Sequence, residues 1–125
     1  MSRPRPPLDP VYLGDIFEAG GEALAREVAD TFLREAARRR TALDAAFDAG
    51  DWTAAALAAH AIISGSSMLG LTAVAEAARQ VEYTAREQRR PAKGAILALD
   101  GAIETAGDLL TRAIAAEARR RGMAT

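Results

Sequence analysis

The sequence contains no cysteine and only one histidine, His60, among its 125 residues. Without cysteine the chain can form no disulfide, no thiol nucleophile and no cysteine metal site. A single histidine also cannot supply a histidine metal cluster or a Cys/His dyad within one chain. These two absences exclude most classes of enzyme.

An excess of charge of one sign is also missing, as is any long apolar run. Sixteen basic and 17 acidic residues give a net charge of −1, so long-range attraction for nucleic acid or anionic lipid is not expected. Leu8, Asp9 and Pro10 stand where a signal peptide would have its apolar core, and no later run is apolar enough to span a bilayer. We therefore expect a cytoplasmic protein whose partner is another protein, with no binding to nucleic acid or membrane.

The chain has the length and apolar content of one folded domain. Half of the residues are apolar and about a quarter are charged, which is typical of a soluble globular protein. Pro4, Pro6 and Pro7 disfavour a helix at the start. The sequence predicts a flexible tail over residues 1–8, a single domain over 9–121 and a short tail over 122–125.

Apolar residues recur with helical spacing through most of the domain, and no run alternates as a strand does. Capping aspartates, glycines and a proline mark the ends of the helices. They predict a short helix up to 20, a long one over 22–49, and further helices over 52–70, 72–90 and 96–121. The punctuating residues are Asp9, Gly20, Gly21, Gly50, Asp51, Gly70 and Pro91. Since the connections are short, we expect an all-α, up-down-up-down four-helix bundle with a short extra N-terminal helix.

Helical geometry predicts that His60 points outward. At about 100° per residue it lies about 160° from Ile62, which we place on the core side. The residues around it carry no charge: Thr53, Ala56, Leu57, Ile63, Ser64 and Ser67. An exposed helix face is normally charged, so a bare one indicates a docking site for a partner. The alternative is a surface histidine without a role.

The segment 59–70, AHAIISGSSMLG, resembles the signature A-H-x-L-K-G-S-S-x-x-L-G of histidine-containing phosphotransfer (HPt) domains. The two align without a gap. His60 matches the phosphorylated histidine, Ile62 the buried aliphatic residue and Ser66 a small residue. Leu69-Gly70 matches the pair that ends the helix. Outside the motif the resemblance also rests on Leu8-Asp9-Pro10, Gly20-Gly21, Phe32-Leu33 and Ala49-Gly50-Asp51-Trp52.

The resemblance implies a phosphorelay intermediate of two-component signalling. His60 would accept a phosphoryl group and exchange it with receiver-domain aspartates or a histidine kinase. The implied partners are a response-regulator receiver domain, a histidine kinase or both. The chain itself would be a monomeric carrier without independent turnover and without a cofactor, because Mg²⁺ is expected on the partner receiver domain.

Two positions depart from the signature. Ile63 stands where the family usually has lysine, and Ser64 where it usually has glycine. In the family that lysine lies near the phosphoryl oxygens, so its loss removes a stabilising cation. Ser64 is still small, and its hydroxyl can hydrogen-bond phosphate. We expect the partner to bind over Ala56, Leu57, Ile63, Ser64 and Ser67.

Glu82 is the second candidate site residue. It aligns with a position of the fourth predicted helix that is often Glu or Gln in related domains and contacts the ring of the phosphorylated histidine. A carboxylate that accepts a hydrogen bond from one ring N–H fixes the tautomer and leaves the other nitrogen with its lone pair. The alternative is a solvated glutamate without a role.

Other functions remain open at this stage. Ile63 in place of lysine favours an HPt-like interaction module that binds a receiver or kinase without being phosphorylated. An enzyme with its own turnover is the weakest reading, because no second catalytic group accompanies His60. DNA binding is also disfavoured, since Arg38, Arg39 and Arg40 have acidic neighbours.

Overall fold

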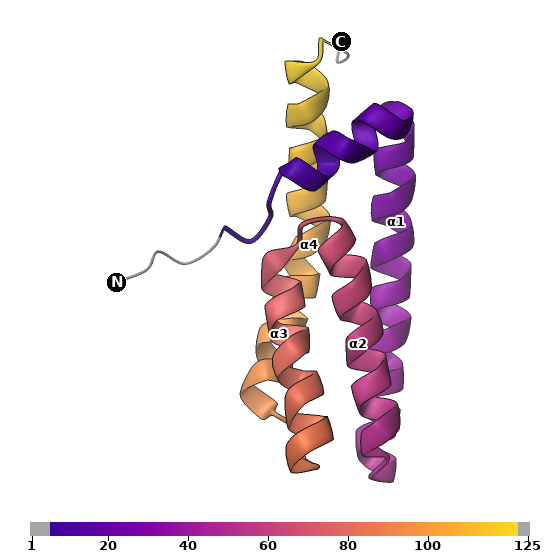
Figure 1. Cartoon of the computed structure of the whole chain (residues 1–125), viewed down its shortest axis with the longest axis vertical. Coiled ribbons are helices and arrows are strands. Elements are labelled where there is room, and N and C mark those ends of the chain that lie inside the picture. Colours follow the sequence, from indigo (N-terminus) through magenta and orange to yellow (C-terminus); the bar gives the residue numbers. More distant parts are fainter. Residues whose placement is uncertain (1–5, 123–125) are drawn as a thin grey trace, which may run out of the picture.

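Four helices pack side by side in the computed structural model, which describes residues 6–122. They are α1 (Val11–Ala49), α2 (Trp52–Met68), α3 (Thr72–Tyr83) and α4 (Lys93–Arg120), and they alternate in direction along the bundle (Figure 1). A π-helical turn, η1 (Thr84–Gln88), extends α3. The predicted all-α, up-down-up-down bundle is confirmed. None of the helices formed by residues 6–122 is long and apolar enough to cross a membrane.

The first helix bends sharply at Gly21. The backbone there has φ 74° and ψ −165°, a conformation that glycine adopts far more readily than other residues. The segment before the bend lies across the end of the bundle, and the segment after it runs along the bundle (Figure 1). The predicted short N-terminal helix is therefore the first part of α1. Just before this helix, the Asp9 carboxylate accepts a hydrogen bond from the N–H of Val11 at 3.1 Å.

Residues 6–8, which we placed in a flexible tail, contact the bundle instead. The Thr72 hydroxyl donates a hydrogen bond to the carbonyl of Pro6, and Leu8 packs against the core. The N–H of Asp9 then donates to the carbonyl of Gly70 at 2.7 Å. Burial of the apolar Leu8 side chain stabilises this docking, which the prolines of the segment do not indicate. Residues 1–5 and 123–125 of the two predicted tails lie outside the described residues.

The end of α4 holds the first part of α1 in place. Arg121 donates hydrogen bonds to Glu117 at 2.8 Å and to Glu18 at 3.0 Å, and its guanidinium lies 5.4 Å from the centre of the Phe17 ring. The hydrogen bond from Arg121 lowers the pKa of the Glu117 carboxyl. One arginine therefore links both ends of the described chain.

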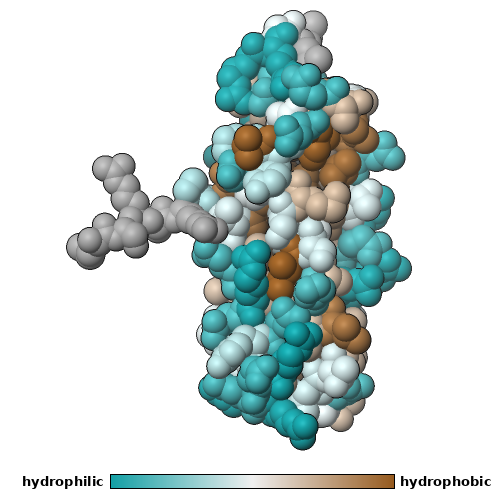
Figure 2. Space-filling model, in the orientation of Figure 1, coloured by the Kyte–Doolittle hydropathy of each residue, from teal (hydrophilic) through white to brown (hydrophobic). Residues whose placement is uncertain are grey.

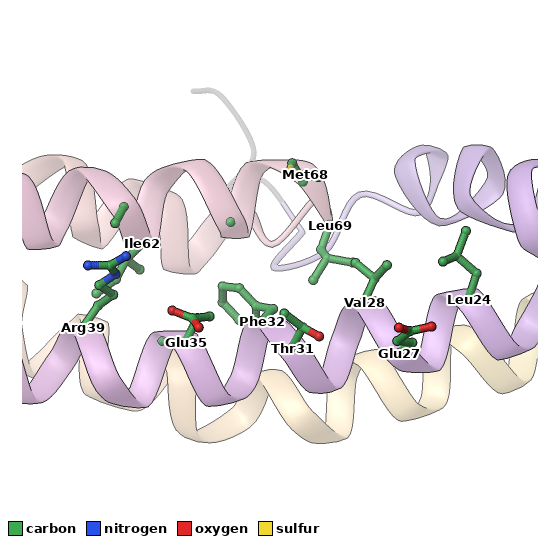
Figure 3. A pocket seen from close by; sticks show the side chains of 13 residues that line it. Leu24, Glu27, Val28, Thr31, Phe32, Glu35, Arg39, Ile62, Met68 and Leu69 are labelled. Carbon is green, nitrogen blue, oxygen red and sulfur yellow. The ribbon is translucent and has the colours of Figure 1, made fainter.

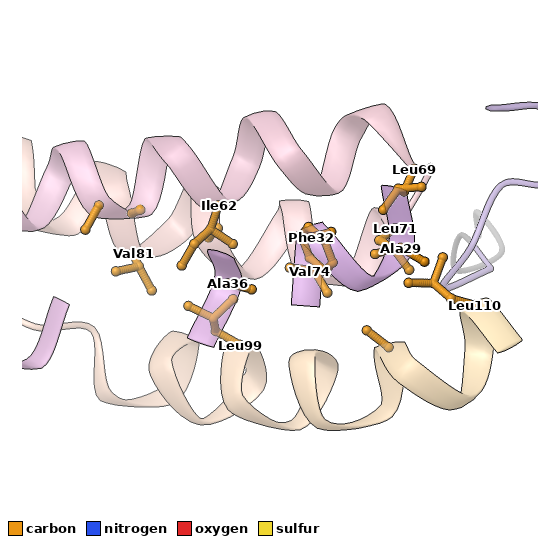
Figure 4. Close-up of a cluster of buried hydrophobic side chains, with 14 of the residues drawn as sticks. Ala29, Phe32, Ala36, Ile62, Leu69, Leu71, Val74, Val81, Leu99 and Leu110 are labelled. Carbon is orange, nitrogen blue, oxygen red and sulfur yellow. The ribbon is translucent and has the colours of Figure 1, made fainter. Parts of the chain in front are cut away.

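The core is formed by aliphatic and small side chains from all four helices, together with Phe17 and Phe32 of α1 (Figure 4). Helix α2 lies close to its neighbours because its inner residues are small. At Gly65, an added Cβ atom would lie 3.1 Å from the ring of Phe32 on α1. Since α2 packs against both α1 and α3, only a narrow strip of it faces solvent. The largest fully buried side chains include Leu43, Ile62, Leu69, Leu71, Val74, Val81, Leu99 and Leu110.

Candidate functional site

His60 lies in the middle of α2 and points into solvent. The helix is capped by Asp51, whose carboxylate accepts a hydrogen bond from the N–H of Ala54 at 3.0 Å. From this start the helical repeat turns Ile62 into the core and His60 away from it. The His60 side chain is 60% exposed, so the predicted orientation is confirmed.

The Glu82 carboxylate on α3 contacts the His60 ring, with Oε2 3.1 Å from Nδ1. The tight turn at Gly70, which has φ 70°, returns the chain so that α3 runs antiparallel to α2. The Glu82 side chain is only 15% exposed. Because a carboxylate can only accept, the proton of a neutral ring lies on Nδ1 and the lone pair on Nε2. The ring contact therefore leaves the Nε2 lone pair without a proton in the neutral form of His60.

The two residues that depart from the signature differ in their exposure. Ser64 is exposed, and its hydroxyl donates to the carbonyl of His60 in its own helix at 3.3 Å. Ile63 is half-buried and packs against the core. Neither side chain brings a positive charge to His60.

Ala56 does not belong to the docking strip, contrary to the sequence prediction. It is only 2% exposed, because η1 also packs against α2 and widens the buried arc of that helix. Leu57 is 62% exposed and Ser64 is exposed, whereas Ser67 is half-buried. The uncharged strip is therefore narrower than the helical wheel indicates. Figure 2 shows the pale to brown surface of α2 beside the strongly hydrophilic lower half of α3.

Arg86 is a site residue that the sequence analysis missed. Its Nη2 atom lies 3.1 Å from Oε2 of Glu82, the same oxygen that contacts His60. The i, i+4 spacing of Glu82 and Arg86 is the signal that could have identified the pair.

Within residues 6–122, no group of three or more histidine, aspartate or glutamate side chains could hold a metal ion.

A groove of about 460 Å³ lies between α1 and α2 (Figure 3). Val28 and Phe32 of α1 and Met68 of α2 are among the residues that line it. It opens on the α1 side of α2, whereas Glu82 approaches His60 from the α3 side. The groove is therefore separate from the histidine site.

Comparison with known proteins identifies the family. The Hpt domain family matches residues 27–119, a range that contains His60, Glu82 and Arg86. The chain is also similar to the crystal structure of histidine-containing phosphotransfer protein B (HptB) from Pseudomonas aeruginosa PAO1, with a TM-score of 0.75 and 24% identity over 89% of this chain and 96% of that one. At this identity the likeness shows a shared fold. No curated protein matches the sequence. Because the family match covers most of the chain and the fold agrees with it, the chain belongs to the Hpt domain family.

Proposed function

We propose that the chain is a phosphorelay intermediate that carries a phosphoryl group on His60. It exchanges this group with the aspartate of a response-regulator receiver domain or with a histidine kinase. The observation that carries the proposal is the 3.1 Å contact between Nδ1 of an exposed histidine and Oε2 of Glu82, in a chain of the Hpt family. The contact leaves Nε2 with its lone pair in solvent, where a partner can reach it.

The proposed transfer is one nucleophilic displacement at phosphorus. The Nε2 lone pair of His60 attacks the phosphorus of the partner's aspartyl phosphate, and the N–P bond forms as the P–O bond to the aspartate breaks. The aspartate leaves as a carboxylate. The phosphorylated ring keeps its proton on Nδ1 and is therefore positively charged, and the Glu82 carboxylate offsets this charge. Such a transfer needs in-line geometry more than further acid–base groups. We therefore propose a carrier without its own turnover or cofactor, with Mg²⁺ on the receiver.

A second candidate function is an interaction module that binds a receiver or kinase without being phosphorylated. Ile63, in place of the usual lysine, favours it. A panel of radiolabelled, phosphorylated receiver domains distinguishes the two functions when transfer and binding are measured on the same samples. A carrier takes label from at least one receiver, whereas a docking module binds a receiver and leaves the label on it.

If a receiver binds over the uncharged strip of α2, a large charged side chain next to His60 should weaken that binding. Ser64→Arg should weaken binding to the receiver about tenfold or more, because the long cation obstructs the uncharged contact surface. The melting temperature should not change, since position 64 faces solvent. Thr111→Arg, at an exposed position of α4, is the matched control. Equal affinity of the two variants, measured by calorimetry, would place the interface elsewhere.

Replacing Ile63 with the lysine that is usual in the family is expected to raise the phosphorylation of His60 modestly. Ile63→Lys should raise the phosphorylated fraction of His60 about two- to fivefold, since a half-exposed charge contact contributes little more than about 1 kcal/mol. The lysine stem can keep the packing of Ile63 while its ammonium reaches solvent. Both the phosphorylated fraction and receiver affinity should be measured on this variant. A loss of affinity without a gain in phosphorylation would instead identify Ile63 as an apolar anchor for the partner.

A further inference from the structure

We propose that the outward face of α4 binds the same face of a second copy of the chain in an antiparallel pair. This departs from the monomer that the family resemblance implies. Helix α4 packs against α1 and α3, and α2 packs against the same two helices, so α2 and α4 lie diagonally across the bundle. The solvent-facing side of α4 is therefore directed away from the face that carries His60, and a second copy bound there leaves His60 free.

Leu97 is the apolar centre of this face. Its side chain is 73% exposed, more than that of any other large apolar residue that the structure describes. Lys93, Glu104 and Asp108 are also exposed, and at about 100° per residue they lie within about 40° of Leu97 around the helix. One exposed leucine is common on a protein surface. Here, however, its neighbours along the helix complete a surface that complements itself.

The backbone beside Leu97 leaves room for the leucine of a second copy. Gly94 and Gly101 lie about one turn before and one turn after Leu97, and a Cβ atom added at either position would meet nothing within 4 Å. Glycine within a helix lowers its stability relative to alanine, and packing inside the described bundle requires neither of these glycines. Their bare backbone gives a leucine from a second copy a surface on which to pack.

An antiparallel pair matches the residues of this face to one another twice. When Leu97 of each copy lies level with Gly101 of the other, Lys93 comes level with Glu104 of the other copy to within the rise of one residue, about 1.5 Å. The two-fold axis makes each of these contacts occur twice. A parallel pair would instead place each charged side chain beside its own copy, where like charges repel. The charges therefore favour the antiparallel arrangement.

The start of α4 adds to this charge complementarity. Ala92 at the N-cap provides no side-chain hydrogen bond, and the first turn of α4 contains no acidic residue. The unpaired N–H groups of a helix start carry a partial positive charge, and here Lys93 adds a full one. In the antiparallel pair, Glu104 and Asp108 of the second copy approach this end. The second copy thus supplies the carboxylates that the first turn of α4 does not contain.

A contact along one helix is small, so the pairing should be weak. Residues 93–105 span only about 18 Å of helix, which is short for a stable dimer, and we expect a dissociation constant of about 10 to 100 µM. At about 1 µM the chain should be mainly monomeric, so folding stability measured there is that of a single bundle. The dimer carries two His60 rings on faces directed away from the contact. A partner with two docking sites would therefore bind it more tightly than it binds one copy.

Exchanging the two charges tests the register. The association of the unphosphorylated chain is measured by sedimentation equilibrium, at concentrations up to about tenfold above the expected dissociation constant. Lys93→Glu and Glu104→Lys each place like charges opposite one another twice, and each should weaken the dimer about tenfold. An equimolar mixture of the two variants should associate about as tightly as wild type, because each new charge then faces an opposite one.

Removing the apolar centre tests the face itself. Leu97→Asn should weaken the dimer about tenfold or more, because two leucine side chains leave the contact. Leu57→Asn removes a similarly exposed leucine from α2, and Glu27→Lys makes the same charge change on α1 as Glu104→Lys makes on α4. Both matched controls should dimerise as wild type does. At about 1 µM the melting temperatures of the variants should match that of wild type, since all these positions are exposed.

Three results would overturn the proposal. They are a wild-type chain that stays monomeric over the whole concentration range, a dimer that survives Leu97→Asn, and a mixture of Lys93→Glu with Glu104→Lys that associates no better than either variant alone. None of them depends on the proposed function, because the samples contain no phosphoryl donor and no receiver. His60→Gln should dimerise as wild type does, so failure of phosphoryl carriage and failure of the dimer are separate outcomes.

Discussion

Replacing Glu82 with alanine is expected to slow phosphoryl transfer to His60 about 10- to 100-fold, the loss that is typical when a metal-bound histidine loses the group that orients its ring. The substitution removes the acceptor that lies 3.1 Å from Nδ1. The ring then rotates freely, and its proton divides between the two nitrogens, so that fewer rings present Nε2 to the partner in line. Single-turnover transfer from a phosphorylated receiver measures the effect.

Two further variants test whether a slower transfer comes from the loss of the contact between Glu82 and His60. Glu82→Gln keeps a carbonyl oxygen that can accept from Nδ1–H, so its transfer rate should lie between those of wild type and Glu82→Ala. Glu87→Ala removes a carboxylate from an exposed position of η1 and should leave the rate unchanged. Equal rates for the alanine variants at positions 82 and 87 would show that Glu82 does not orient the ring.

Gly70→Ala is expected to destabilise the fold by about 2 to 4 kcal/mol. This loss is the sum of two costs: alanine in a left-handed backbone conformation, and an added methyl group in a packed site. Gly70 has φ 70°, and a Cβ atom there would collide with the carbonyl oxygen of Asp9 and would lie 2.9 Å from the ring of Tyr12. The turn also sets the approach of α3 to α2. Chemical denaturation, with the midpoint and slope fitted together, measures the loss.

Gly101→Ala is the control, for which we expect a gain in folding stability and not a loss. Gly101 lies within α4, and no atom is found within 4 Å of the Cβ that the substitution would add. Alanine should therefore stabilise the helix by about 0.5 to 1 kcal/mol. A similar loss of stability in both variants would mean that the turn at Gly70 is not specially constrained.

Local chemistry explains why the helix ends were predictable. Asp51 caps its helix through its own carboxylate, Gly21 adopts a backbone that ends the first helical segment, and Pro91 lies in the break between η1 and the last helix. The outward direction of His60 follows from periodicity alone. The contact of Glu82 with the ring was predicted only through the family resemblance, because spacing along one helix does not say which residue of another helix lies opposite.

Features that depend on how helices pack together were not predictable in the same way. The burial of Ala56 depends on η1, a turn with no signal that the sequence analysis used. The docking of Leu8 depends on the end of the bundle against which it packs. Arg86 was overlooked because its i, i+4 pairing with Glu82 gains meaning only when Glu82 is known to face His60.

The chemical stability of the transferred phosphoryl group tests the central claim most directly. After incubation with a phosphorylated receiver, the chain should carry one phosphoryl group, on its only histidine. A phosphohistidine is lost in acid and kept in alkali, so the label should show that pattern, and His60→Gln should take up none. A label that survives acid, or one that remains in His60→Gln, would contradict phosphoryl carriage on His60.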